Sequence, residues 1–236
     1  MRAVVLAGGL GTRLRPYTTI LPKPLVPVGD RPILEHILRR LHASGVRLVD
    51  LCVGHLGELI QVYLSQSDSL PGDLELRWHW EEEPLGTAGA LTLVPDLAGS
   101  FVVMNGDILT TLDYRELVAF HDRGGAALTV ATHAKRVEIE LGVIEGTGDR
   151  IVGYREKPRL DYDVSMGIYV YDERALEHLP PEGPCQFPEL VQRLLDAGEP
   201  VLRFRSDAEW FDIGTPQEYQ RAVDAFDRAP ETFRGG

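Results

Sequence analysis

Three glycines and two cations near the amino terminus have the types and spacing of a phosphate-binding loop. An apolar, β-branched stretch leads directly into Gly8, Gly9 and Gly11. Because glycine has no Cβ, such a loop can turn its N–H groups together toward an anion. Arg13 adds a planar fork of donors, and Lys23, which stands between two prolines, adds a point charge. This pattern predicts a site for the phosphate groups of a ligand.

Two common glycine-rich motifs do not fit this loop. It lacks the Gly-Lys-Ser/Thr ending of a P-loop, and Arg13 stands where the dinucleotide-binding fingerprint has its third glycine. The loop therefore does not predict a plain Rossmann cofactor site.

Two aspartates are the candidate metal ligands. Asp107 follows the apolar stretch 101–104, and Asp212 follows an aromatic pair. Ligands of open α/β sheets collect at the carboxyl ends of the parallel strands, so Asp107 is expected to share a cleft with Gly8 and the loop 81–89. Two carboxylates from distant parts of the chain suit one Mg²⁺ ion that keeps several waters. The alternatives are that Asp107 caps the next segment and that Asp212 belongs to the turn before the last helix.

A series of short motifs, in a fixed order, resembles the sugar-1-phosphate nucleotidyltransferases, also called nucleotide-sugar pyrophosphorylases. The matching stretches are 8–16 (Gly-Gly-x-Gly-Thr-Arg-Leu-x-Pro), 22–25 (Pro-Lys-Pro-Leu), 83–89, 105–107, 156–158, 167–169 and 210–216. They span nearly the whole chain. The resemblance implies a Mg²⁺-dependent enzyme that joins a nucleoside triphosphate and a sugar-1-phosphate and releases pyrophosphate.

The resemblance also implies roles for individual residues. The implied catalytic residues are Arg13, Lys23, Asp107, Lys157 and Asp212, with Asp107 and Asp212 as the metal ligands. The implied nucleotide-binding residues are Leu6, Ala7, Gly8, Gly9, Gly11, Thr12, Arg13, Lys23, Glu83, Pro84, Gly86, Thr87, Asn105 and Gly106. The implied sugar-phosphate-binding residues are Gly142, Glu156, Lys157, Ser165 and Gly167. In this set a carboxylate can accept from sugar hydroxyls, and a lysine can neutralise a phosphate. Without the other motifs, the Glu-Lys-Pro string would indicate only a surface ion pair.

The base and the sugar are indicated less directly. The string 81–89 is close to that of mannose-1-phosphate guanylyltransferases, which favours GTP, while dTTP, UTP, CTP and ATP stay open. Ser165-Met166-Gly167 stands where the family usually has Asn-Ala-Gly, and a serine donates one hydrogen rather than two. An acceptor such as a cyclitol or amino-sugar phosphate therefore stays open, as does a noncatalytic sensor of nucleotides or sugar phosphates.

Apolar periodicity predicts one α/β domain that positions these residues. Strands are expected at 3–7, 48–53, 75–81, 101–105, 126–133, 141–145, 151–156, 165–171 and 201–205, and helices at 32–44, 56–65, 87–93, 114–123, 187–197 and 216–226. The expected fold is a three-layer α/β/α, Rossmann-like arrangement around a mixed, mostly parallel sheet. Residues 1–123 would form the nucleotide-binding half, 124–228 a β-rich half for the sugar phosphate, and 229–236 a frayed tail.

The amino-acid composition limits the classes of partner that we expect for this protein. The formal charge of −12 argues against a nucleic-acid or anionic-membrane partner, because both require clustered Lys and Arg. The chain has no apolar run of membrane-spanning length and no secretory signal pattern, so we expect a cytoplasmic protein. Cys52 and Cys185 have neither the number nor the spacing of a disulfide framework or zinc site and are expected to be buried thiols. The family resemblance makes a homo-oligomer possible.

Overall fold

A seven-stranded mixed sheet forms the centre of the computed structural model, which describes residues 1–234. Its strands lie in the order β12 (Val201–Arg205), β8 (Leu128–Glu138), β11 (Arg159–Asp172), β6 (Ser100–Asn105), β1 (Arg2–Ala7), β4 (Leu48–Val53) and β5 (Glu75–Trp80). All neighbouring pairs are parallel except those of β11, which runs antiparallel to both β6 and β8. The expected mixed, mostly parallel sheet is confirmed.

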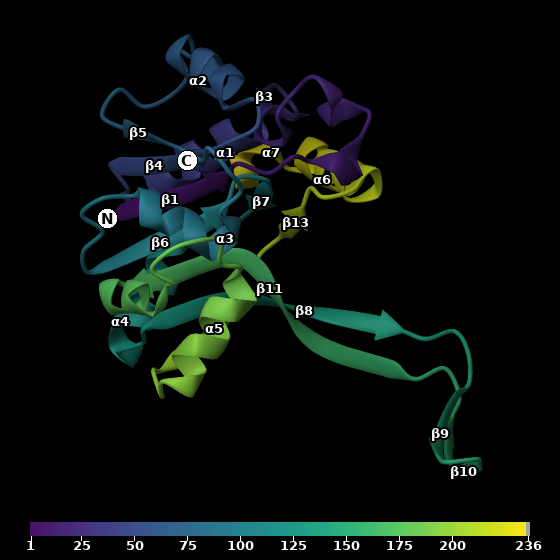
Figure 1. The fold of residues 1–236 in the computed structure, drawn as a ribbon. Coiled ribbons are helices and arrows are strands. Elements are labelled where there is room, and N and C mark those ends of the chain that lie inside the picture. The colour runs from purple at the N-terminus through teal and green to yellow at the C-terminus, as the bar shows by residue number, and fades with distance from the viewer. Residues whose placement is uncertain (235–236) are drawn as a thin grey trace.

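Helices cover both faces of this sheet (Figure 1). Along β1, Ala3 and Val5 belong to one core cluster and Val4 to the other, as the alternation of a strand requires. The first cluster includes residues of α1 (Ile33–Ala43), α2 (Gly57–Ser65), α4 (Tyr114–Gly124) and α6 (Pro216–Arg228). The second includes residues of α3 (Gly86–Gly89) and α5 (Phe187–Asp196), together with both cysteines, which are buried and free. The three expected layers are therefore present.

Three short strand pairs complete the fold. They are β2 (Pro27–Val28) with β3 (Arg31–Pro32), β7 (Ile108–Thr110) with β13 (Trp210–Asp212), and β9 (Val143–Thr147) with β10 (Arg150–Arg155). Between residues 1 and 234, no helix is long and apolar enough to cross a membrane.

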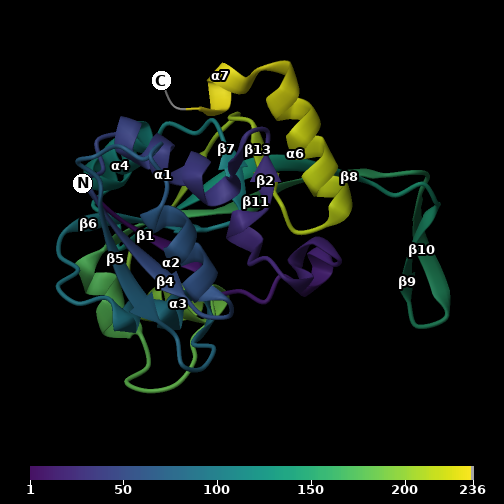
Figure 2. The same ribbon diagram turned by 90° about the horizontal axis from the view of Figure 1, so that it is seen from above.

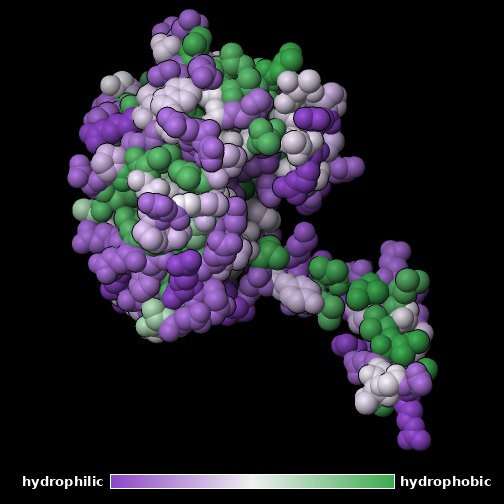
Figure 3. Space-filling view, viewed as in Figure 1, coloured by the Kyte–Doolittle hydropathy of each residue, from purple (hydrophilic) through white to green (hydrophobic). Residues whose placement is uncertain are grey.

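The long strands β8 and β11 differ most from the sequence expectation. They stay paired from Tyr171↔Leu128 out to Arg159↔Glu138, well beyond the sheet, and β9 and β10 follow at their end. Figures 1 and 2 show the resulting projection, here called the arm (residues 134–163), leaving the body, and Figure 3 shows it from the side. The expected strands ended at 133 and began again at 165, whereas in the structure the ladder continues through 134–138 and 159–164, with cross-strand ion pairs such as Arg136–Asp161.

The chain after Arg228 is more ordered than expected. Residues Pro230–Phe233 form the short helix α7, and the Phe233 side chain is only 2% exposed. Its ring packs against Phe211 and Phe226, with ring centroids 6.3 and 6.0 Å away. The expectation of a frayed tail was wrong for residues 229–234, because it overlooked this aromatic contact with the core; residues 235–236 lie outside the described part.

A buried ion pair fixes the edge of β1 to β4. Asp50 is fully buried and accepts hydrogen bonds from Arg2 Nε at 2.6 Å and from Arg2 Nη2 at 3.1 Å. His79 Nε2 lies 2.7 Å from the same carboxylate. Both carboxylate oxygens are thus satisfied without water.

Asp50→Ala should lower the free energy of unfolding by about 3–5 kcal/mol, because Arg2 would lose its carboxylate partner in a dry setting. Glu75→Ala, which removes an exposed partner of Arg77, should cost no more than about 1 kcal/mol. Urea unfolding of both variants measures the difference. Equal unfolding midpoints for the two variants would show that the buried ion pair stabilises the fold no more than the exposed pair does.

Candidate active site

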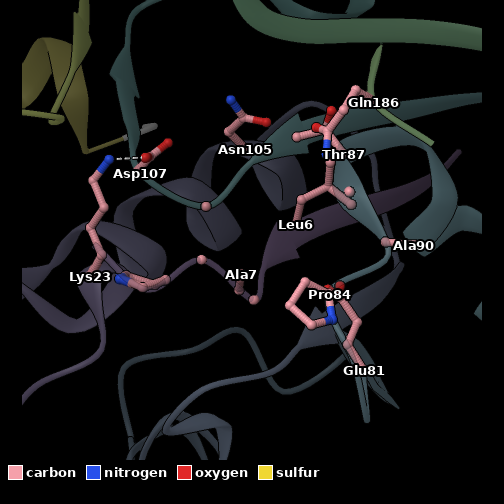
Figure 4. Close-up of a pocket in the computed structure, with 15 residues that line it drawn as sticks. Leu6, Ala7, Lys23, Glu81, Pro84, Thr87, Ala90, Asn105, Asp107 and Gln186 are labelled. Atoms are coloured by element: carbon pink, nitrogen blue, oxygen red, sulfur yellow. Dashed lines mark hydrogen bonds and ion pairs between the residues drawn. The ribbon is translucent and has the colours of Figure 1, made fainter. Parts of the chain in front are cut away.

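A single pocket collects most of the residues expected to bind the nucleotide. It opens where β1 and β6 end, at the carboxyl edge of the parallel strands (Figure 4). Its lining is Leu6, Ala7, Gly8, Gly9, Lys23, Pro24, Glu81, Pro84, Gly86, Thr87, Ala90, Asn105, Gly106, Asp107 and Gln186. The pocket thus joins the glycine loop, the 81–90 segment and the Asn-Gly-Asp motif, which are far apart in the chain.

The glycine loop leaves room in this pocket for a ligand. A Cβ on Gly9 would meet nothing within 4 Å, so this part of the loop faces open space. A Cβ on Gly8 would instead lie 2.5 Å from Glu81 Oε1. A larger residue at position 8 would therefore displace the Glu81 carboxylate from its place in the pocket.

Lys23 lies between the two candidate metal ligands. Its Nζ is paired with Asp107 Oδ2 and lies 3.8 Å from Asp212 Oδ1. Burial and the charge of Asp107 raise the pKa of Asp212, while Lys23 and Arg13 oppose that shift. Two carboxylates that repel one another are thus held together by a cation.

The short pair β7–β13 brings the second aspartate to this point. Asp212 lies opposite Ile108, and Ile213 N donates to Asp107 O at 3.1 Å. The cap of α6 is Thr215, whose hydroxyl accepts from Glu218 N at 3.3 Å. Asp212 lies at the turn before α6, as its alternative had it, but its side chain does not cap the helix.

The two aspartates fit a divalent cation. Asp107 Oδ1 is buried and has no hydrogen-bond partner within the described chain, and the Asp212 carboxylate is half-exposed beside it. Two carboxylate groups are a typical protein contribution to a Mg²⁺ site, because Mg²⁺ binds hard oxygen donors and keeps several waters or phosphate oxygens in its coordination shell. Within residues 1–234 there is no group of three or more His, Cys, Asp or Glu arranged for a metal.

Arg13 lies at the same end of the site but outside the pocket lining. It follows Gly11, whose φ of 60° starts the 3₁₀ turn Thr12–Leu14. Its Nη2 atom lies 3.5 Å from the position that a Cβ on Gly214 would occupy, next to Asp212. Gly11, Thr12 and Glu83, all expected at the nucleotide, are likewise absent from the lining.

Four lining residues were not among those assigned to the nucleotide, although the loop 81–89 was expected in this cleft; they are Pro24, Glu81, Ala90 and Gln186. Leu85 N donates to Glu81 Oε2 at 3.1 Å, while burial raises the pKa of this carboxyl. In Figure 4, Glu81 lies beside Pro84, at the opposite end of the pocket from Lys23 and Asp107. The sequence signal for Glu81 is its position, because it is the first of three consecutive glutamates and stands at the end of a predicted strand.

Contacts with a distant segment explain why Gln186 reaches the pocket. Cys185 O accepts from Ala88 N at 3.0 Å and from Gly89 N at 2.9 Å, and Cys185 N donates to Leu85 O at 2.8 Å. The Thr87 hydroxyl accepts from Phe187 N at 2.9 Å, across 100 residues. No local pattern in the sequence marks this pairing.

The residues expected to bind the sugar phosphate fall into two groups. Gly167 lies at the pocket's edge, because a Cβ there would sit 2.7 Å from Asn105 Nδ2, and Gly167 N donates to Ser165 Oγ at 3.3 Å. Gly142, Glu156 and Lys157 instead lie on the arm, in the segments that join β9 and β10 to β8 and β11. The structure does not bring these three to the pocket, because β8 and β11 continue as a paired ladder; their roles stay predictions.

The fold is α/β, and its pocket lies at the carboxyl ends of parallel strands. A family model described as nucleotidyl transferase matches residues 2–228. The chain belongs to the nucleotidyl transferase family, and the expected resemblance to sugar-1-phosphate nucleotidyltransferases is confirmed.

Two curated relatives illustrate the range of this family. The mannose-1-phosphate guanylyltransferase catalytic subunit beta of Danio rerio is 30% identical over 249 residues, which cover 100% of this chain and 69% of the relative. A UTP–glucose-1-phosphate uridylyltransferase of Synechocystis is 29% identical, over 94% of this chain and 62% of that protein. The chain thus spans less than the full length of both.

A solved structure matches over its whole length. HddC from Yersinia pseudotuberculosis, in a crystal structure with GMP-PN, has a TM-score of 0.73 and 25% identity, over 95% of this chain and 99% of that one. A putative glucose-1-phosphate thymidylyltransferase from Bacillus anthracis, at 24% identity and a TM-score of 0.73, shares the fold. The family model and the two curated relatives support sugar-1-phosphate nucleotidyltransferase activity.

Proposed function

We propose that this chain transfers a guanylyl group from GTP to a sugar-1-phosphate and releases pyrophosphate, with Mg²⁺ as the metal. The observation that carries the proposal is a pocket with a charged end, made by Lys23 and Asp107, and an acidic end, made by Glu81. A nucleotide has matching ends, since its phosphates need cations and its base needs hydrogen-bond partners.

The carboxylate of Glu81 favours guanine over the other bases. Guanine presents two adjacent donors on its Watson–Crick edge, which one carboxylate can accept together. Uracil and thymine present one donor between two oxygen acceptors, and adenine and cytosine place an acceptor beside their amino group. The guanylyltransferase among the relatives and the guanine nucleotide bound by HddC agree with this choice.

The reaction needs no nucleophile from the protein. The acceptor phosphate is ionised at neutral pH, and its oxygen attacks the α-phosphorus while pyrophosphate leaves in line. Lys23 would neutralise the α-phosphate as charge moves, and Arg13 would hold the leaving phosphates. A Mg²⁺ ion on Asp107 and Asp212 would supply further charge neutralisation at these phosphates.

A pyrophosphate-release assay with Mg²⁺, a panel of nucleoside triphosphates and a panel of sugar-1-phosphates tests the proposal. We expect release with GTP and one sugar-1-phosphate. Triphosphate binding without release across the whole panel would favour the sensor hypothesis or an acceptor such as a cyclitol phosphate. The expected cytoplasmic location stays a prediction.

Glu81→Gln should reduce the preference for GTP over UTP by about 10- to 100-fold, because the amide presents one acceptor and one donor where the carboxylate accepts twice. The ratio of kcat/KM for the two nucleotides measures this change. The exposed neighbour Glu82 gives the matched control, since Glu82→Gln removes the same charge outside the pocket. An unchanged ratio in Glu81→Gln would remove Glu81 from base selection.

UTP is the second candidate nucleotide, because the uridylyltransferase of Synechocystis is nearly as similar to this chain as the guanylyltransferase of Danio rerio. A kcat/KM for UTP above that for GTP in the wild-type protein would replace our choice of base and leave the reaction type intact.

A further inference from the structure

The active-site pocket has three corners, and the nucleotide of the proposed function occupies two of them. In Figure 4, Lys23 and Asp107 lie at one corner, Glu81 at a second, and Thr87 with Gln186 at a third. The proposed GTP extends from the first corner, where its phosphates lie, to the second, where its base lies. The third corner, formed by Thr87 and Gln186, is left for another group.

The order of the strands places the third corner far from the base. Glu81 follows β5, which is the edge strand on one side of β1. On the other side of β1 come β6 and then β11. Phe187, directly after Gln186, stacks on Tyr169 of β11, with ring centroids 4.1 Å apart. The base therefore lies toward the β5 side of the pocket, and Gln186 lies toward the β11 side.

The second substrate needs this side of the pocket. In an in-line reaction the acceptor phosphate approaches the α-phosphorus from the side opposite to the leaving pyrophosphate, so its sugar lies beyond the phosphates and away from the base. Asn105 lines the pocket on this side and lies next to β11, since a Cβ on Gly167 would be 2.7 Å from Asn105 Nδ2. The third corner is thus the part of the pocket that can hold the sugar ring.

Hydrogen bonds fix Gln186 at the start of α5. Its backbone N donates to Glu189 Oε2 at 3.1 Å, and the next residue, Phe187, donates from its backbone N to Thr87 Oγ1 at 2.9 Å. A Cβ on Gly86, whose φ is 77°, would lie 2.7 Å from Gln186 Nε2. The amide of Gln186 therefore lies over Gly86 in the pocket wall, and a side chain at position 86 would displace it.

The side-chain amide of Gln186 is complementary to neighbouring hydroxyl groups of a sugar ring. It presents one acceptor oxygen and an NH₂ group with two donors, and each hydroxyl can both donate and accept. One amide can therefore accept from one hydroxyl and donate to the next. Gln186 is an exposed residue, so a ligand can reach its amide. Because the amide carries no charge, it suits the neutral sugar rather than the phosphates.

We propose that Gln186 determines which sugar-1-phosphate this chain accepts, through hydrogen bonds from its amide to two neighbouring hydroxyl groups of the sugar ring. This inference rests on the proposed function, because it places the acceptor of that reaction at the third corner. It adds a residue that the sequence did not assign to the sugar phosphate.

Gln186→Met tests the proposal, because methionine keeps the length of the side chain and removes its hydrogen-bonding groups. We expect the KM for the sugar-1-phosphate to rise about 10- to 100-fold, and the KM for GTP to change by no more than about twofold. Gln192→Met is the matched control, because Gln192 is an exposed residue of the same helix outside the pocket lining. This control should change neither KM.

Deoxy analogues of the sugar-1-phosphate show whether the contact is direct. In the wild type, loss of a hydroxyl that Gln186 binds should lower kcat/KM about tenfold, whereas Gln186→Met should hardly distinguish that analogue from the parent sugar. A role only in fixing the start of α5 would leave the ranking of the analogues unchanged. An unchanged ranking, an unchanged KM for the acceptor or a raised KM for GTP alone would each overturn the proposal.

Failure of the proposed function can be told apart from failure of this inference. Turnover with UTP rather than GTP would change the base and leave the acceptor test as it stands. If no triphosphate supports turnover, titration calorimetry with the same sugar-1-phosphates measures the acceptor affinity directly, and equal affinities for the wild type and Gln186→Met, or binding to neither, would overturn the inference. Thermal unfolding checks that the variant is folded, and Gln186→Glu, which loses only the donors, replaces Gln186→Met where it is not.

Discussion

Asp107→Asn should lower turnover by at least about a hundredfold and leave the protein folded. The asparagine keeps the shape of the side chain but removes the charge, and the loss of one preorganised charge contact at a transferring phosphate commonly costs this much. The buried Oδ1 of Asp107 has no partner in the described chain, which leaves it for a metal ion. Steady-state pyrophosphate release at saturating substrates measures the loss.

The fold should tolerate this change because of Asp212. The two carboxylates repel one another, and Asp107 helps to raise the pKa of Asp212. Removing one charge loses the pair with Lys23 but also ends that repulsion, so the melting temperature should change little. Asp227→Asn, which removes an exposed carboxylate from α6, is the control for charge alone. Wild-type turnover in Asp107→Asn would reject the metal assignment.

Chelation gives an independent measure of the same site. If Asp107 and Asp212 hold the catalytic metal, EDTA should abolish turnover in the wild-type protein, and added Mg²⁺ should restore it. The Asp107→Asn variant should need a higher Mg²⁺ concentration for any turnover that remains.

Local patterns predicted most elements and the nucleotide half of the site. Gly8, Asp107 and the loop 81–89 each fall just after a predicted strand, and ligands of an open α/β sheet collect at the carboxyl ends of its parallel strands. The prediction that they share a cleft needed no knowledge of side-chain contacts. The pocket lining includes Gly8, Asp107 and residues of the loop 81–89.

What the sequence could not predict depends on pairing between distant segments. The sequence analysis assigned Asp212 and Asp107 to one metal ion, but the three-residue pair β7–β13 that joins them is too short to leave a periodic pattern. Gln186 enters the pocket through hydrogen bonds of Cys185 to the 85–89 segment. The sequence analysis did not extend the two long strands into the arm, because the partners of the charged residues there lie across the ladder, about 25 residues away for Arg136 and Asp161.

Lys23→Met should lower turnover by about 100- to 1,000-fold while strengthening metal binding. The ammonium now neutralises Asp107 and lies 3.8 Å from Asp212 Oδ1, so it competes with a metal ion for the same carboxylates. Without it, both carboxylates face one another with less compensation, and a divalent cation gains affinity. In the transition state, however, negative charge builds up at the α-phosphate, and the variant lacks the lysine that would neutralise it. We therefore expect kcat to fall by a larger factor than the KM for GTP changes.

These opposite effects distinguish a catalytic lysine from a structural one. Isothermal titration with Mg²⁺ should show tighter binding in Lys23→Met, and the unfolding temperature of this variant should rise more with Mg²⁺ than that of the wild type. As a control, Arg193→Met removes one exposed cation from α5 and should change neither the Mg²⁺ affinity nor the rise in unfolding temperature with Mg²⁺. If Lys23 served only to hold the two aspartates together, Mg²⁺ would replace it and turnover would recover at high metal concentration. We expect turnover to stay low in the metal-saturated variant. The metal can neutralise the two carboxylates, but it does not replace the charge that Lys23 supplies at the α-phosphate in the transition state.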